Sequence, residues 1–136
     1  MAGLAHLSVG LAAKPVVPRI PVWALILIAY GIDLVFFPFM VAGLEQFPKD
    51  GVVGTAPWSH SLLMAVVWSV LAASIAMFVT KDMRIILVIG LLFFSHWAID
   101  FISHPMTAVF PSARGLLLLP GTSREIGLGL YRTQSG

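Results

Sequence analysis

The sequence contains no cysteine, which excludes disulfide bonds, a thiolate nucleophile and a metal site with cysteine ligands. Charged residues are also scarce: they make up 10% of the 136 residues, whereas a soluble domain carries about 25%. Hydrophobic residues make up 59%, and the mean hydropathy is +0.97. This composition is typical of an integral membrane protein, in which lipid surrounds the helices and their polar groups face one another.

The positive net charge of +2 does not indicate a nucleic-acid partner, because the eight lysine and arginine residues form no basic stripe. They lie in connections and in the tail, where positive charge marks the cytoplasmic face of a membrane protein. The connections 14–19 and 81–84 each carry two of these residues and would share one face. We expect that face to be cytoplasmic, and we expect the lipid bilayer to be the main partner of the chain.

Three apolar stretches are long enough to span a bilayer, for which a helix needs about 20 residues. The predicted spans are residues 21–44, 59–80 and 85–104, followed by a tail, 105–136, whose apolar runs are too short to span. Pro38 should kink or end the first span, and Ser59 is expected to cap the second. We interpret the acidic residues between the spans, Glu45 among them, as solvated charges.

The N-terminal segment 2–13 is apolar and helix-compatible, but at about 1.5 Å per residue it reaches only about 18 Å, roughly half a bilayer. It is expected to form a half-helix or re-entrant helix that dips back into the membrane. The sequence therefore predicts a single transmembrane domain, residues 1–136, of the all-α class. Its fold would be a helical bundle of three spanning helices plus this N-terminal helix.

Two titratable groups inside the spans are predicted to lie at one depth. Asp33 lies 12 residues after Pro21, and His96 lies 12 residues after Arg84. Because both spans start on the same face, both groups should lie about 18 Å into the membrane. A carboxylate at a helix centre costs about 2.5–3.5 kcal/mol on insertion scales, so something must compensate for it. A divalent cation shared with imidazoles would do so.

The remaining histidines converge on the same region. His6 would lie about 12 Å deep on the N-terminal helix, and His60 opens the second span from the opposite face. Asp100 and His104 follow His96 at intervals of four residues, so the three form one stripe on their helix. A pair four residues apart can chelate one ion. The outer two histidines of the stripe are about 12 Å apart. His104 would therefore serve a second metal or support the first, or Pro105 would distort the last turn and bring His104 into the site.

The candidate metal ligands are His6, Asp33, His60, His96, Asp100 and His104. Mixed nitrogen and oxygen ligands suit Zn²⁺ first, with Mn²⁺ or Fe²⁺ as alternatives. Simpler interpretations remain open for each of them. The stripe could be a polar network that bonds across helices, and Asp33 could pair with a histidine or line a proton path. His60 could be interfacial, and His6 could be a solvated N-terminal residue.

Five motifs follow one another between about residues 4 and 132: "AHLSVGLA", an aspartate in the next apolar helix, "SHSLL", "SHWAIDFISH" and "GLGLY". In this order they resemble the YdjM-like family of membrane-bound metal-dependent hydrolases. The resemblance implies a multi-span protein of a bacterial or archaeal cytoplasmic membrane with a His/Asp metal centre formed by the six candidate ligands. Many members carry a second acidic residue after the helical aspartate, where this chain has "GIDLVF", so a second metal has less support.

The first functional hypothesis is a membrane-embedded metal-dependent hydrolase. A bound cation lowers the pKa of water toward about 7, and Asp33 or Asp100 would be the catalytic group that accepts its proton. The apolar surroundings favour a lipid-linked or amphiphilic ester or phosphoester as the substrate. Arg114 or Arg124 would hold an anionic head group.

The alternative hypothesis is a small non-catalytic accessory subunit of a larger membrane complex, or of a homo-oligomer, with a structural His/Asp site. Small residues such as Gly31, Gly90, Ala72 and Ala73 would suit helix packing in such an assembly. A proton or metal-ion path is a third hypothesis. It is weaker, because the polar groups crowd one half of the membrane instead of continuing to both faces.

Overall fold

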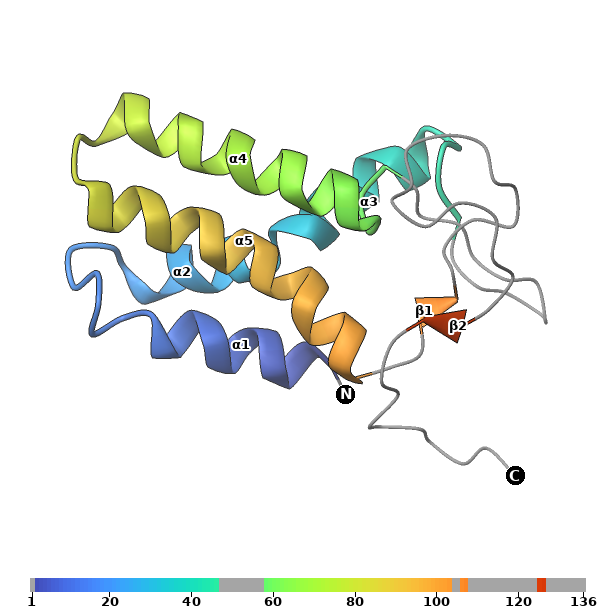
Figure 1. Cartoon of the computed structure of the whole chain (residues 1–136), viewed down its shortest axis with the longest axis horizontal. Helices are drawn as coiled ribbons and strands as arrows, with labels where there is room; N and C mark the ends of the chain where they lie inside the picture. Colours follow the sequence, from blue (N-terminus) through green and yellow to red (C-terminus); the bar gives the residue numbers. More distant parts are fainter. Residues whose placement is uncertain (1, 47–57, 104–105, 108–124, 127–136) are drawn as a thin grey trace.

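The structure, a computed structural model of the whole chain, describes residues 2–46, 58–103, 106–107 and 125–126. Its elements are the helices α1 (Ala2–Ala12), α2 (Val22–Ala29), α3 (Gly31–Val41), α4 (Leu62–Val79) and α5 (Met83–Ser103), and the strands β1 (Met106–Thr107) and β2 (Glu125–Ile126). The two short strands pair antiparallel. The helices form the predicted all-α bundle (Figure 1).

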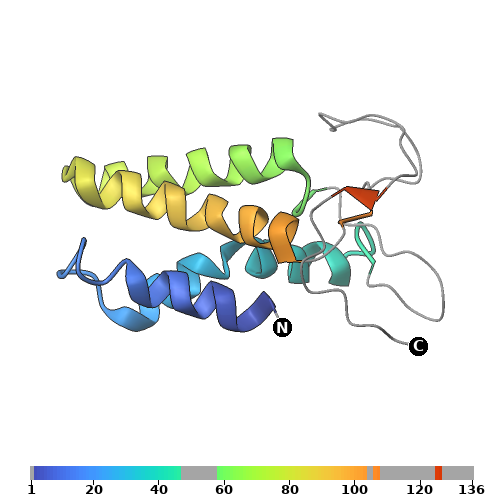
Figure 2. The ribbon, with the colours of Figure 1, turned by 60° about the horizontal axis from the view of Figure 1, so that its bottom comes forward.

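The lengths of the helices fit a membrane protein. Both α4 and α5 are long and apolar enough to cross a membrane, and the bent pair α2–α3 makes a third span if it is counted as one. Apolar side chains such as Phe78 and Val79 lie on the outside of the bundle, as lipid-facing residues do. The shorter α1 runs antiparallel to α2 and packs against α2 and α5, which confirms the predicted N-terminal helix (Figures 1 and 2).

The first predicted span, residues 21–44, is not one helix. It bends by 56° between α2 and α3. Tyr30 leaves the helical region at the bend, with φ −91° and ψ 10°. Next to it, a Cβ on Gly31 would lie 2.1 Å from the ring of Phe93 on α5, so that ring takes the space of a side chain. Pro38 lies inside α3, which ends three residues later at Val41, and the 56° bend of this span lies at Tyr30 and not at the proline.

The two basic connections lie together at one end of the bundle, as predicted, and the N-terminus lies at the other end (Figure 1). Val17 from the first connection is buried in the apolar core with Leu25 and Ala29 of α2 and Ile85 of α5. The core thus ties the first connection to α2 and α5. It leaves the opposite end of the bundle for polar side chains.

Gly31→Ala is expected to destabilise the bundle, because the new methyl group would overlap the ring of Phe93. Overpacking of this kind costs about 1–3 kcal/mol. Thermal unfolding in detergent should therefore begin at a lower temperature than in the wild type, and Phe93→Leu should restore part of the loss. Gly3→Ala is the control, because a Cβ there meets only the hydroxyl of Tyr30, at 3.6 Å. Equal melting of Gly31→Ala and the wild type would contradict this packing.

Candidate metal centre

Five titratable side chains from four segments meet at the end of the bundle near the N-terminus. This His/Asp cluster consists of His6 on α1, Asp33 in the first turn of α3, His60 just before α4, and His96 and Asp100 on α5. The structure brings these five side chains of the predicted set together. His104 lies outside the described residues, as do Arg114 and Arg124.

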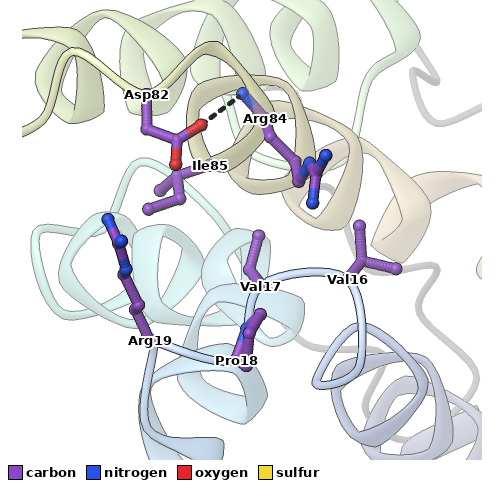
Figure 3. Close-up of a pocket in the computed structure, with 7 residues that line it drawn as sticks. All are labelled: Val16, Val17, Pro18, Arg19, Asp82, Arg84 and Ile85. Atoms are coloured by element: carbon purple, nitrogen blue, oxygen red, sulfur yellow. Dashed lines mark hydrogen bonds between the residues drawn. The ribbon is translucent and has the colours of Figure 1, made fainter.

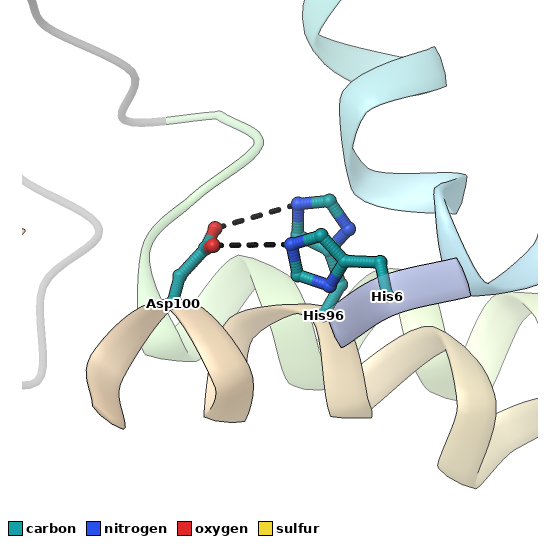
Figure 4. A group of neighbouring side chains, drawn as sticks. All are labelled: His6, His96 and Asp100. Atoms are coloured by element: carbon teal, nitrogen blue, oxygen red, sulfur yellow. Dashed lines mark hydrogen bonds and ion pairs between the residues drawn. The ribbon is translucent and has the colours of Figure 1, made fainter. Parts of the chain in front are cut away.

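Asp100 joins α1 to α5 inside the cluster. Its Oδ1 lies 3.2 Å from Nε2 of His6, and its Oδ2 lies 3.4 Å from Nε2 of His96 (Figure 4). The two imidazole rings stack in parallel, with centroids 3.9 Å apart. All three side chains are buried. Each oxygen of this buried carboxylate therefore faces an imidazole nitrogen.

Asp33 and His60 complete the cluster from α3 and from the start of α4. Oδ1 of Asp33 lies 3.4 Å from Nε2 of His60 and 3.4 Å from Nε2 of His96. Nε2 of His60 also lies 3.9 Å from Oδ2 of Asp100. The side chain of Asp33 is 38% exposed, more than any other in the cluster. The cluster is therefore open to its surroundings beside α3.

The bend in α2–α3 orients His96. Carbonyl groups in the last turn of a helix lack a partner within that helix, and α2 ends at Ala29. Nδ1 of His96 lies 3.0 Å from the carbonyl oxygen of Ala29. A carbonyl oxygen only accepts, so Nδ1 carries the hydrogen and the lone pair of Nε2 points at the carboxylates of Asp33 and Asp100. That arrangement needs a proton or a cation between Nε2 and the carboxylates.

A similar support fixes His60. The hydroxyl of Ser59 donates to Oε2 of Glu45 over 2.8 Å, and its oxygen lies 2.7 Å from Nδ1 of His60. Since the hydroxyl hydrogen is used by Glu45, Nδ1 of His60 donates to Ser59 and the lone pair of Nε2 faces the cluster. A histidine that ligates a metal usually has such a partner on its other nitrogen.

Two predictions at this support are wrong. Glu45 is not a solvated charge: it is 1% exposed, and its Oε1 accepts hydrogen bonds from the backbone amides of Trp58 and Ser59. Ser61, not Ser59, caps α4, because its hydroxyl accepts from the backbone amide of Met64. The sequence offers one indication of this contact: Glu45 and His60 lie at the two ends of the same predicted connection, on one face of the membrane.

His6 has weaker support than the other two histidines. Within the part of the chain that the structure describes, its buried Nδ1 has no hydrogen-bond partner. The ring of Tyr30 stands edge-on to the ring of His6, with centroids 5.6 Å apart. The hydroxyl of Tyr30 donates to the carbonyl of Gly3, which ties α1 to the bend. These contacts hold His6 beside Asp100.

The spacing of the donor atoms suits a metal ion. Two groups of three residues could hold one: His6, His96 and Asp100, and Asp33, His60 and His96, each with ligand atoms within 4.8 Å of one another. Two ligands about 2.0–2.1 Å from a tetrahedral ion are about 3.3–3.4 Å apart. The distances of 3.4 Å from Asp33 to His60, from Asp33 to His96 and from His96 to Asp100 agree with that geometry.

Comparisons with known proteins leave the function to be argued from this geometry. No protein-family model, curated protein or solved structure matches the chain. The resemblance to the YdjM-like family therefore rests on the sequence motifs alone. What the side chains can do must be inferred from their positions in the His/Asp cluster.

Glu45→Gln is expected to reverse the hydrogen bonds that support His60 while keeping their shape. The new amide would donate to the oxygen of Ser59, whose hydroxyl would then donate to Nδ1 of His60 and move the imidazole hydrogen to Nε2. Nitrogen-15 NMR of labelled histidine should show this change of tautomer in a folded variant.

Glu45→Ala is the comparison for that experiment. It leaves buried donors unpaired, at about 1–3 kcal/mol each, and should lower the melting temperature more than Glu45→Gln does. An unchanged His60 tautomer in folded Glu45→Gln would contradict the role of Glu45.

Proposed function

We propose that this chain is a membrane-embedded hydrolase that uses one divalent cation, held by Asp33, His60, His96 and Asp100. The observation that carries the proposal is the spacing of their inward-facing atoms. Asp33 lies 3.4 Å from His60 and from His96, His96 lies 3.4 Å from Asp100, and Asp100 lies 3.9 Å from His60. Two nitrogen and two oxygen ligands favour Zn²⁺, with Mn²⁺ or Fe²⁺ as alternatives. A cation also explains why the lone pairs of two imidazoles face carboxylates.

His6 has a supporting role in this proposal. Its Nε2 donates to Oδ1 of Asp100 and so leaves Oδ2 turned toward His96. The orphaned Nδ1 of His6 favours this assignment, because a ligating histidine usually has a partner on its other nitrogen. His6 therefore orients Asp100 and does not bind the ion itself.

The chemistry follows from the exposure of Asp33. A divalent cation held here would lower the pKa of water toward about 7 and would polarise an ester or phosphoester. Asp33 lies on the open side of the cluster, so substrate approaches past α3 and Oδ2 of Asp33 accepts the proton of the attacking water. Asp100, buried between His6 and His96, holds its geometry throughout. The apolar helices around the cluster favour an amphiphilic or lipid-linked substrate.

A second function is favoured by one observation. Four protein ligands make a closed site, and closed sites are typical of structural zinc, whereas catalytic sites keep a position open. In this alternative the cation fixes the helices of a non-catalytic accessory subunit. Its partner in the bilayer is another membrane protein or a second copy of the chain.

Metal analysis tests the site. Detergent-purified wild type should hold one transition-metal ion per chain by inductively coupled plasma mass spectrometry, and His60→Ala, His96→Ala and Asp100→Ala should lose it. His6→Ala should bind the metal about 10–100-fold more weakly, as expected of a residue that orients a ligand. Asp82→Asn removes a carboxylate far from the cluster and should change nothing. A folded wild type that binds neither Zn²⁺ nor Mn²⁺ would leave only a proton-bonded network.

The variant Asp33→Asn distinguishes the proposal of a hydrolase from the proposal of an accessory subunit. Asparagine keeps an oxygen ligand but cannot accept a proton, so the variant should retain metal and lose about 10²–10⁴-fold in kcat. The measurement is hydrolysis of chromogenic esters and phosphoesters with acyl chains of increasing length, in detergent, with and without a chelator. A metal-loaded wild type that hydrolyses none of them would favour the accessory subunit.

A further inference from the structure

A second polar feature lies at the end of the bundle opposite the His/Asp cluster. Residues 16–19 of the first basic connection and Asp82, Arg84 and Ile85 at the start of α5 line a cavity of about 250 Å³ (Figure 3). The hydrolase proposed above does not use these residues. Pockets for drug-sized ligands measure roughly 300–1,000 Å³, so this cavity suits a smaller chemical group.

The cavity has an excess of positive charge. Arg19 and Arg84 are both exposed and reach toward it from the two connections (Figure 3). Among the described residues, neither guanidinium forms an ion pair. The one acidic residue there, Asp82, accepts a hydrogen bond from the backbone amide of Arg84 through Oδ1. Two guanidinium groups therefore face one carboxylate, and an anion would complement them.

The first connection is held in place without a ligand. Nζ of Lys14 donates to the carbonyl oxygens of Pro18 and Ile20, over 2.8 and 2.7 Å, and closes the connection into a turn. Val17 is buried against the core that includes Ile85 and forms the apolar floor of the cavity. Arg19 thus projects from a fixed backbone, which reduces the entropy lost when it binds.

The position of the cavity indicates what anion it meets. It lies where the membrane-length helices α4 and α5 are joined. The ends of helices that span a bilayer meet its head groups. Trp23 near the start of α2 is exposed, as aromatic residues at the membrane interface are. Basic pockets between membrane helices bind anionic head groups, and arginine binds phosphate through paired hydrogen bonds. We propose that Arg19 and Arg84 form a binding site for the phosphate of an anionic phospholipid.

The test is a lipid titration of the detergent-purified full chain, followed by native mass spectrometry. Phosphatidylglycerol should bind more tightly than phosphatidylcholine. Arg19→Gln and Arg84→Gln should each weaken its binding about fivefold, the contribution of one basic residue near an anionic membrane surface. Asp82→Asn should strengthen binding, because it removes the negative charge and keeps the oxygen that caps α5.

Lys81→Gln is the matched control. It removes one positive charge from the same connection, but Lys81 does not line the cavity. Phosphatidylglycerol binding should stay unchanged in this variant. An equal loss in Lys81→Gln would reduce the site to general charge attraction and overturn the proposal. So would equal affinity for the two lipids, or inorganic phosphate that displaces phosphatidylglycerol, since the ligand would then be a free anion.

Discussion

Asp100 is the side chain on which the packing of α1 against α5 depends. Both oxygens of its buried carboxylate face imidazoles, one from each helix. The interior of a membrane offers no water to a polar group, so a carboxylate there is tolerated only where the protein supplies partners. α1 must therefore lie close enough for His6 to reach it. On its other side α1 packs closely on α2, since a Cβ on Gly10 would lie 3.0 Å from Cα of Ile26.

The bend at Tyr30 positions Asp33 and His96 in the His/Asp cluster. It ends α2 at Ala29, whose carbonyl orients His96, and it starts α3 so that Asp33 falls in the first turn, facing His60 and His96. A straight span would continue its hydrogen bonds past Ala29 and leave no carbonyl there for an imidazole. One local break in a helix thus places Asp33 in the His/Asp cluster and orients His96 within it.

The two ends of the bundle differ in charge and in what they can bind. One end gathers imidazoles and carboxylates that contact one another inside the protein. The other end presents guanidinium groups outward over an apolar floor. The first end has the His and Asp groups that could hold a metal ion, and the proposed hydrolysis is assigned to it. The second end carries Arg19 and Arg84, to which the proposed binding of an anionic phospholipid is assigned.

Spacing along the sequence determined the helical class, the apolar stretches and the common depth of His6, Asp33, His60, His96 and Asp100. A helix rises by a fixed amount per residue, so position along a span gives depth without any knowledge of packing. Tertiary structure alone decided the bend beside Gly31 and the burial of Glu45. Both depend on groups that are distant in the sequence. The ring of Phe93 packs at the bend, and the backbone amides of Trp58 and Ser59 donate to Glu45. The residues that flank Gly31 and Glu45 in the sequence do not indicate these neighbours.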